Sequence, residues 1–293
     1  MKKSGKKITD ITIKDVKTYF KDERYKIKKN IESFSDLPEK IFAEMHPVFV
    51  VSTGRAGSEL LVKLMNESKM GSIYHEPRPR MFYSSKLIFE RKIDIQSKQV
   101  AYLNARYDLL KKAYLEENRF VETNNRNSFF IVALSKLFPK SKFIHLVRHP
   151  GDFVRSGIRR EYYRGNENDD SRITPLADDE IYSSWTNLSD IQKIGWLWNT
   201  TNDFIEKEKV YLNDNNFLLI KSEDLFSKPD TYNEICNFLD HPFLSQKKIR
   251  SIISKPINKQ KQSFYPKWKQ WSKIEKNFLI ETTPLGKKYG FWD

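Results

Sequence analysis

Cysteine is almost absent from this sequence of 293 residues, in which Cys236 is the only one. A single cysteine excludes a disulfide framework within the chain and a zinc site built on cysteine ligands. Cys236 lies in a helical pattern over residues 232–239, which favours a small buried residue over a nucleophile. Neither internal cross-links nor a cysteine-bound metal is therefore expected to stabilise the fold.

Long apolar runs are also missing. No stretch approaches the roughly 18 apolar residues that a membrane-spanning helix needs. The first residues, MKKSGKK, are charged and lead into no apolar segment, so no signal peptide is visible. We expect a cytoplasmic protein without a membrane span.

Positive charge and aromatic residues, in contrast, are abundant. Lysine and arginine number 52 against 38 aspartates and glutamates, which gives a net charge of +14. A surplus of this size suits an anionic ligand or substrate, and it also attracts nucleic acids without specificity. Aromatic residues make up 14% of the chain, too many for a disordered protein. The length suffices for one large α/β domain, with or without an extension.

The segment GRAGSE, from Gly54 to Glu59, follows a short apolar run over residues 48–51. Such a run predicts a strand buried on both faces, and the apolar spacing over residues 60–65 predicts a helix that packs on a sheet. In the order strand, loop, helix, the free N–H groups of the first helical turn form an anion site. The alternative is an ordinary turn between a strand and a helix.

This loop lacks the lysine of an ATP-binding P-loop, whose motif reads G-x-x-x-x-G-K-[ST]. Here Ser58 and Glu59 follow Gly57, and Arg55 is the only cation in the loop. Gly57 allows a tight backbone and Ser58 adds a hydroxyl donor. The loop therefore suits one phosphate-like group better than a Mg²⁺-bound triphosphate, which disfavours a kinase.

A second pattern of strand, turn and helix lies in FIHLVRHPGD, residues 143–152. A buried strand ends at Arg148, and Asp152 is expected to cap a helix that runs through Arg160. Ser156 and Arg160 are i, i+4 neighbours on this helix. Ligands of open α/β sheets bind beyond the carboxyl ends of the strands, so Arg148 and the first loop should share one edge. We expect each motif to bind one phosphate-like group.

One carboxylate follows another predicted strand. Glu76 comes directly after a short strand pattern over residues 71–75, in a loop that prolines hold extended. A carboxylate in a rigid loop is a candidate acid or base, and a surface ion pair is the alternative. His145 and His149 are interpreted as structural, one in a strand and one in a turn.

The domain organisation follows from composition. Residues 1–44 are rich in charged side chains and predict a partly ordered arm, and residues 45–293 predict one domain. Residues 161–183 are polar and predict a mobile insertion that acts as a lid or contacts an acceptor. Residues 255–271 are basic and aromatic, and they either fold over a bound anion or wrap the surface.

Together these motifs resemble the sulfotransferases that use 3′-phosphoadenosine-5′-phosphosulfate, over residues 47–292. TGRAGS at residues 53–58 is similar to the family's 5′-phosphosulfate loop, G-x-R-S-G-[ST]-[ST]. VRHPGD with Ser156 resembles its 3′-phosphate motif. Further counterparts are SEDL at 222–225, KPIN at 255–258 and YGF at 289–291. The resemblance implies the family's P-loop NTPase-like fold, an α/β structure of three layers, α/β/α, around a central parallel sheet. The tyrosylprotein and carbohydrate branches look nearest.

The resemblance also implies a function and site residues. It implies transfer of a sulfuryl group, without a metal, from this donor to a hydroxyl of a carbohydrate, a protein tyrosine or a small molecule. Arg55 would also act in catalysis, and Glu76 matches by position the base of the tyrosylprotein branch. Glu122 matches the base of the heparan-type branch, and Glu76 is favoured. Donor binding is assigned to Gly54, Arg55, Ala56, Gly57, Ser58, Glu59, Arg148, Ser156, Arg160 and Lys255.

The sequence departs from the family's pattern at several positions. Ala56 and Glu59 replace hydroxyl residues of the loop, Ser222 stands where a tyrosine is usual, and no lysine stands near Thr123. The acceptor therefore stays open. The alternatives are a P-loop kinase and a basic nucleic-acid-binding module, which requires a cationic face with interleaved aromatics. Because only residues 255–271 hint at such a face, we expect no nucleic-acid partner.

Overall fold

A five-stranded sheet forms the centre of the computed structural model, which describes residues 12–29, 33–91, 93–255 and 265–292. The strands are β1 (Val48–Ser52), β2 (Ser72–His75), β3 (Phe120–Thr123), β4 (Lys142–Val147) and β5 (Phe217–Lys221). Their order across the sheet is β2-β3-β1-β4-β5, and every pair is parallel. All five strands therefore end at the same edge of the sheet.

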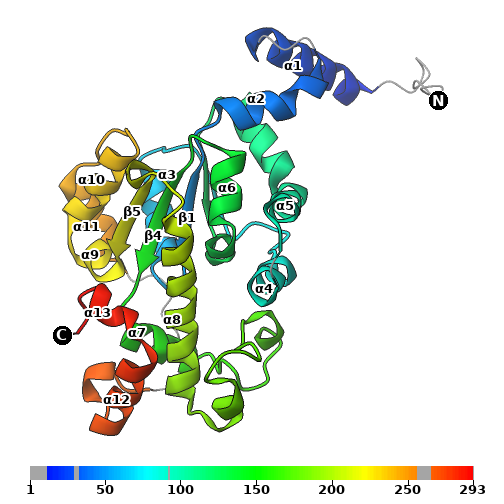
Figure 1. Ribbon diagram of the computed structural model, residues 1–293. Coiled ribbons are helices and arrows are strands. Elements are labelled where there is room, and N and C mark those ends of the chain that lie inside the picture. Colours follow the sequence, from blue (N-terminus) through cyan, green and yellow to red (C-terminus); the bar gives the residue numbers. More distant parts are fainter. Residues whose placement is uncertain (1–11, 30–32, 92, 256–264, 293) are drawn as a thin grey trace.

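The strands separate two hydrophobic cores, one on each face of the sheet. In β1, Val48 and Val50 lie in one core, and Phe49 and Val51 lie in the other. An unbroken apolar run of this kind is typical of a strand covered on both faces. The first core is covered by α3 (Ser58–Glu67), α10 (Pro229–Phe238) and α11 (Gln246–Ile253), and the second by α5 (Ile95–Leu115), α6 (Ile131–Leu137) and α8 (Asp190–Lys209). Figure 1 shows these layers, which confirm the predicted α/β/α fold.

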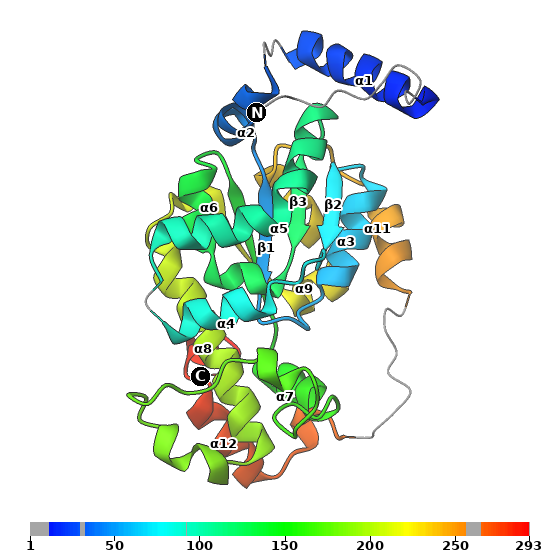
Figure 2. The same ribbon diagram turned by 90° about the vertical axis from the view of Figure 1, so that its right-hand side faces the viewer.

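The remaining helices lie near the two ends of the strands (Figures 1 and 2). At the amino ends lie α1 (Ile13–Lys29) and α2 (Leu37–Glu44). At the carboxyl ends lie α4 (Phe82–Glu90), α7 (Pro150–Ile158), α9 (Ser222–Ser227), α12 (Lys273–Thr282) and α13 (Leu285–Lys288). The 3-10 helices are η2 (Phe34–Asp36), η3 (Asn125–Phe129), η4 (Asp169–Ser171), η5 (Tyr182–Asn187), η6 (Asp214–Asn216) and η7 (Trp268–Gln270).

The charged segment 1–44 contains two different kinds of helix. α2 buries Leu37 and Ile41 in the core and packs against α5. α1 has no buried residue. Residues 37–44 therefore pack as part of the domain, and α1 is the part that resembles an arm.

The helix after β4 differs from the prediction at both ends. α7 begins at Pro150 and ends at Ile158, short of Arg160. Its N-cap is His149, whose Nδ1 accepts a hydrogen bond from the N–H of Gly151 at 3.0 Å. The predicted cap at Asp152 is therefore wrong. Proline favours the first position of a helix, so the helix begins three residues earlier than expected.

The segment 161–183 has little regular structure, as expected, but hydrogen bonds hold it together. The carboxylate of Asp169 accepts hydrogen bonds from the backbone N–H groups of Tyr163, Gly165 and Asn166, at 2.8 to 3.1 Å. The hydroxyl of Tyr163 donates to the carbonyl of Ile173 at 2.7 Å. This segment follows α7 and lies beyond the carboxyl ends of the strands.

Candidate active site

A cavity of about 860 Å³ lies at the edge of the sheet where the five strands end. Segments that follow each strand line it, together with α7 and the loop after α7. After β1 come residues 53–60, after β2 His75 and Glu76, after β3 Asn125 and Arg126, after β4 Arg148, and after β5 Phe226. The structure thus brings both predicted anion motifs and Glu76 to one place, as the position of ligand sites in open α/β sheets predicts.

Arginine is strongly enriched in this cavity. The chain has 15 arginines and 37 lysines. Eight of the arginines line the cavity, whereas none of its described lining residues is a lysine. The planar guanidinium group binds carboxylates and phosphates through two parallel hydrogen bonds and is less strongly hydrated than an ammonium group. The cavity is therefore built for oxyanions. The eight are Arg55, Arg80, Arg126, Arg148, Arg155, Arg159, Arg160 and Arg172.

The loop after β1 has the backbone of an anion site. Gly54, Arg55 and Gly57 all have positive φ, at 80°, 55° and 89°. Gly57 caps α3, and its carbonyl accepts the N–H groups of Leu60 and Leu61. The earlier N–H groups of the first helical turn have no partner within the helix and are available to an anion.

Hydrogen bonds from residues that follow β4 and β5 hold this loop in place. Arg148 donates a hydrogen bond to the carbonyl of Arg55 at 2.8 Å. The hydroxyl of Ser222 donates to the carbonyl of Ala56 at 2.7 Å and lies 3.1 Å from that of Val147. The side chain of Ala56 is fully buried in the core, so a hydroxyl at this position would not face the cavity. Ala56 offers only its backbone to a ligand, and Ser222 fixes that backbone.

The α7 side of the cavity carries a cluster of cations. Arg160 donates to the hydroxyl of Ser156 at 2.9 Å, as the i, i+4 spacing predicts. Burial lowers the pKa of both Arg148 and Arg160, and the nearby Arg55 lowers both further. Nε of Arg55 and Nε of Arg148 are buried without a hydrogen-bond partner. A bound anion would offset both the burial of these cations and the repulsion between them.

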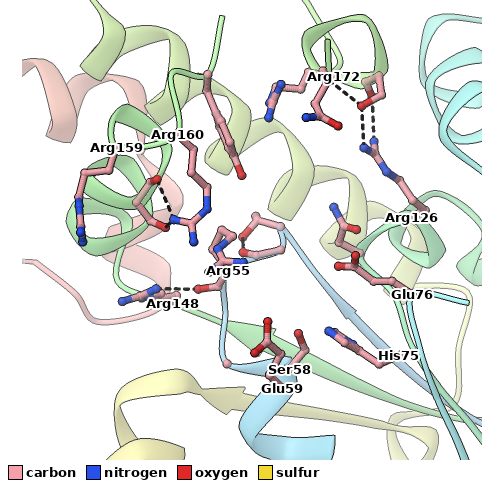
Figure 3. Close-up of a pocket in the computed structure, with 18 of the residues that line it drawn as sticks. Arg55, Ser58, Glu59, His75, Glu76, Arg126, Arg148, Arg159, Arg160 and Arg172 are labelled. Atoms are coloured by element: carbon pink, nitrogen blue, oxygen red, sulfur yellow. Dashed lines mark hydrogen bonds between the residues drawn. The ribbon is translucent and has the colours of Figure 1, made fainter. Parts of the chain in front are cut away.

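Glu76 lies on the other side of the cavity. Figure 3 shows it beside His75 and Arg126, with Arg55 between it and Arg148. Its backbone N–H donates to the carbonyl of Thr123 at 3.0 Å, and its φ is 43°. The side chain is exposed to the cavity. Glu76 is thus a solvent-accessible carboxylate that faces the predicted anion loop.

The comparison with protein families agrees with this site. The model of the family described as "Sulfotransferase family" matches residues 47–245, which is more than half of the chain. The protein belongs to the sulfotransferase family. It is accordingly a sulfotransferase enzyme, and none of the curated proteins matches its sequence.

Solved sulfotransferases share the fold of this sulfotransferase at low sequence identity. Mouse sulfotransferase SULT7A1 complexed with PAP is 15% identical with a TM-score of 0.51, and the match covers 89% of this chain and 95% of that one. Sulfotransferase STF9 from Mycobacterium avium is 13% identical with a TM-score of 0.51, over 95% of this chain and 84% of that one. At such identities the likeness extends to the fold alone.

The structure does not bring Glu122 into the cavity of the sulfotransferase. Its side chain is fully buried, and its two carboxylate oxygens accept hydrogen bonds from Tyr102, Arg106 and Asn124 at 2.7 to 3.0 Å. Arg106 also donates to the carbonyl of Pro79 at 2.8 Å, in the loop that follows Glu76. Arg106 of α5 thus connects Glu122 of β3 to this loop, and Glu122 pairs with a structural arginine.

Lys255 does not line the cavity either. It is an exposed residue two positions after the end of α11. Residues 256–258, the rest of that predicted motif, lie outside the described residues. Further along, Trp268 stacks on His149 with ring centroids 4.2 Å apart, so this part of the tail covers the start of α7.

Sequence reasoning missed the cavity's arginines outside the two motifs. Arg126 had a usable signal, because it follows β3 as Arg148 follows β4 and strand ends share one edge. Arg155 and Arg159 belong to α7 and its C-cap, so the predicted helix already contained them, whereas Arg80 and Arg172 depend on how loops fold over that edge. All four line the cavity.

A membrane span needs a long apolar helix, and a metal site needs a group of ligating side chains. None of the described helices is long and apolar enough to cross a membrane. Over the described ranges, no group of three or more His, Cys, Asp or Glu side chains is placed to hold a metal ion.

Proposed function

We propose that this sulfotransferase transfers a sulfuryl group from 3′-phosphoadenosine-5′-phosphosulfate to a hydroxyl group of an acceptor. The observation that carries the proposal is the arginine-lined cavity in which Arg148 contacts the loop from residues 53–58. The donor has two anionic groups, a 3′-phosphate and a 5′-phosphosulfate, and the cavity offers two groups of anion donors. The PAP bound to the structurally similar mouse enzyme supports the same donor class.

The residues present fit this donor. The N–H groups of the first turn of α3, with Arg55 and Ser58, would hold the phosphosulfate. Arg148, Ser156 and Arg160 would hold the 3′-phosphate. Partnerless buried Nε atoms of Arg55 and Arg148 support this fit, because buried donors without acceptors are costly.

The same cavity offers a surface for the adenine base. Phe226 is 38% exposed, and its ring lies 6.0 Å from Cζ of Arg148. An exposed ring beside phosphate-binding groups suits a stacked base, and such stacking contributes about 1–3 kcal/mol per base. Phe226 would thus place the nucleoside between the two anion groups.

When bound, the donor supplies the sulfuryl group and leaves as adenosine 3′,5′-bisphosphate. Glu76 accepts the proton of the acceptor hydroxyl as its oxygen attacks sulfur. Arg55 and the loop amides stabilise negative charge at the reacting centre. Positioning and charge stabilisation supply most of the rate acceleration, as in phosphoryl transfer, and a general base contributes about 10²–10⁴-fold.

Two observations favour Glu76 over Glu122 as the base. Glu76 is exposed to the cavity, whereas Glu122 is buried. Both oxygens of Glu122 are occupied by donors from Tyr102, Arg106 and Asn124. A carboxylate that cannot reach the acceptor cannot take its proton.

The test is a calorimetric titration with adenosine 3′,5′-bisphosphate in the presence of a metal chelator. We expect binding of one nucleotide per chain without Mg²⁺. At about 100 times its Kd, the nucleotide should add about 2.7 kcal/mol to the free energy of unfolding. ATP with Mg²⁺ and a short oligonucleotide are the controls, for the kinase and the nucleic-acid alternatives. Binding only with Mg²⁺, or tighter binding of either control, contradicts the proposal.

A further inference from the structure

A second group of arginines lies on the Glu76 side of the cavity, opposite the cations of α7. Arg126 follows β3, Arg80 lies between β2 and α4, and Arg172 follows η4. Figure 3 shows Arg126 and Arg172 across the cavity from Arg148. The groups proposed to hold the donor lie on the loop after β1 and around α7. The second group is therefore placed to meet a different molecule.

Arg126 is held by neutral groups. Its guanidinium donates to the carbonyl of Ser171 at 2.8 Å and to the hydroxyl of Ser171 at 3.1 Å. The ring of Phe82 lies 4.6 Å from its Cζ, and its Nε is buried without a partner. Burial, with the nearby Arg172, lowers the pKa of Arg126 to about 10. Within the described part of the chain no carboxylate forms an ion pair with Arg126, although Glu76 is near enough to favour its charged form.

Arg80 and Arg172 differ in how their charges are balanced. Arg172 forms an ion pair with Asp169 and lies 3.7 Å from the ring centroid of Tyr162. Arg80 is exposed to the cavity, 5.9 Å from the ring centroid of Phe82, and makes no ion pair with any described residue. Glu161 and Glu167 also line the cavity, but neither pairs with Arg80 or Arg126. Two cations on this side therefore lack a carboxylate partner.

Aromatic rings cover one side of these guanidinium groups. Phe82 packs against both Arg80 and Arg126, at the start of α4. Cation–π contacts of this kind hold the flat face of the group. The N–H edges of Arg80, which can form paired hydrogen bonds to a carboxylate or phosphate, remain for another partner, whereas Arg126 donates through two nitrogens to Ser171 and keeps Nε without an acceptor.

We propose that the acceptor is itself an anion, with a carboxylate or phosphate group close to the reacting hydroxyl, and that Arg80 and Arg126 bind this group. The inference rests on the proposed function, because it assumes that the hydroxyl reaches Glu76. The substituents next to that hydroxyl then face Arg126 and Arg80. A neutral acceptor would leave the buried Arg126 cation uncompensated after it excludes water from the cavity, which is costly.

The test uses two matched pairs of hydroxyl compounds with the protein saturated with adenosine 3′,5′-bisphosphate. One pair is 4-nitrophenyl β-D-glucuronide and 4-nitrophenyl β-D-glucoside, which differ in a carboxylate. The other is glucose 6-phosphate and glucose, which differ in a phosphate. We expect at least one anionic member to bind ten times more tightly than its neutral partner, and its advantage to shrink as salt is raised. The pair that responds identifies the anion.

Two arginine variants test which residues cause the preference for the anionic compound. Arg80→Gln and Arg126→Gln should each reduce the preference for the anionic member by at least fivefold and leave affinity for the nucleotide within twofold. Lys86→Gln is the matched control. Lys86 lies on α4, where it donates to the carbonyl of Asp170 and pairs with Glu90, and it does not line the cavity. Arg80 makes no structural hydrogen bond among the described residues, so its variant remains informative if Arg126→Gln loosens the contact with Ser171.

The outcomes separate this inference from the proposed function. If the nucleotide binds but neither pair shows a preference, including the case in which none of the four compounds binds, the acceptor inference is wrong and the donor proposal stands. An equal preference in wild type, Arg80→Gln and Arg126→Gln also overturns it, because another group then binds the anion. If the nucleotide itself does not bind, the donor proposal fails first.

Discussion

Arg148 donates a hydrogen bond to the backbone carbonyl of Arg55, at 2.8 Å, across 93 residues of sequence. The contact joins the end of β4 to the anion loop after β1, and these two strands are neighbours in the sheet. The two anion motifs are therefore one structural unit. A change at Arg148 should alter both the second anion site and the loop that Arg55 belongs to.

Arg148→Ala should weaken binding of adenosine 3′,5′-bisphosphate by about 10–100-fold, because hydrogen bonds to a charged group contribute about 1.5–3 kcal/mol. The preference for this nucleotide over adenosine 5′-monophosphate, which lacks the 3′-phosphate, should disappear. Calorimetric titration of both nucleotides measures the effect.

Arg164→Ala is the control for Arg148→Ala. Arg164 is an exposed arginine that pairs with Asp190 and does not line the cavity. Arg164→Ala should leave the affinities for adenosine 3′,5′-bisphosphate and for adenosine 5′-monophosphate unchanged. Thermal unfolding must first show that Arg148→Ala is folded, since Arg148 also packs at the end of a strand. A folded Arg148→Ala that still prefers the 3′-phosphorylated nucleotide would place the 3′-phosphate elsewhere.

Glu76→Gln should lower turnover by about 10²-fold or more while the nucleotide affinity holds, because the amide keeps the shape and removes the basicity. Transfer from the sulfate donor to whichever matched compound binds provides the assay. The argument depends on the accessible position of Glu76 in the cavity. Unchanged turnover in Glu76→Gln removes it from the mechanism.

Glu122→Gln makes the same chemical change at a buried position. It removes the partner of the fully buried Arg106, and breaking a buried ion pair costs about 3–5 kcal/mol. We expect a large loss in the free energy of unfolding, measured with urea. Loss of turnover in a fully stable Glu122→Gln, with Glu76→Gln active, would instead transfer the role of base to Glu122.

The anion motifs could be read from the sequence because each is local. A strand, a glycine or proline turn and a helix follow one another within about a dozen residues, and the order alone places their N–H groups and cations. Arg80 and Arg172 had no such signal. Their position in the cavity depends on the place of β2 at the edge of the sheet and on the path of residues 161–183, which local spacing does not determine.

The two candidate carboxylates show the same limit. Glu122 pairs in register with Phe49 of β1, and its carboxylate meets Tyr102 and Arg106 of α5. The sequence shows a carboxylate near the end of a strand, but not which helix supplies its partners. Glu76 follows its strand, so its side chain is free of the layer of helices and reaches the cavity.

The buried His145 should make the protein less stable in acid. Burial lowers the pKa of His145 to about 4, and its Nε2 lies 2.9 Å from Oδ1 of Asn202, to which the neutral ring donates. The unfolded chain binds a proton near the ordinary histidine pKa of about 6.5, whereas the folded protein does not until about pH 4. The contribution of His145 to the free energy of unfolding should therefore be constant above pH 6.5. Between pH 6.5 and pH 4 it should decrease by about 3 kcal/mol.

His145→Gln isolates this effect from other titrating groups. The variant loses stability at pH 7 through altered packing, but it cannot take up the proton. The difference between variant and wild type in the free energy of unfolding, from urea titrations, should therefore narrow between pH 7 and pH 4. An unchanged difference across this range would show that His145 has no part in the acid sensitivity.

Gly57→Ala should reduce nucleotide affinity by at least tenfold. Gly57 has a φ of 89°, and an added Cβ would lie 2.8 Å from Cζ of Phe226. The methyl group therefore either displaces the ring proposed to stack on adenine or shifts the loop that binds the phosphosulfate.

Gly165→Ala separates this contact from backbone strain, because Gly165 has a similar φ of 83° and nothing within 4 Å of the added Cβ. Both variants should lose about 1–2 kcal/mol of stability from the left-handed backbone, but only Gly57→Ala should lose affinity in calorimetry. Combining Gly57→Ala with Phe226→Leu makes room for the methyl group, so it should recover the part of the loss due to a shifted loop and leave only the loss of stacking. Normal nucleotide binding by Gly57→Ala would show that neither the loop nor Phe226 contacts the nucleotide as proposed.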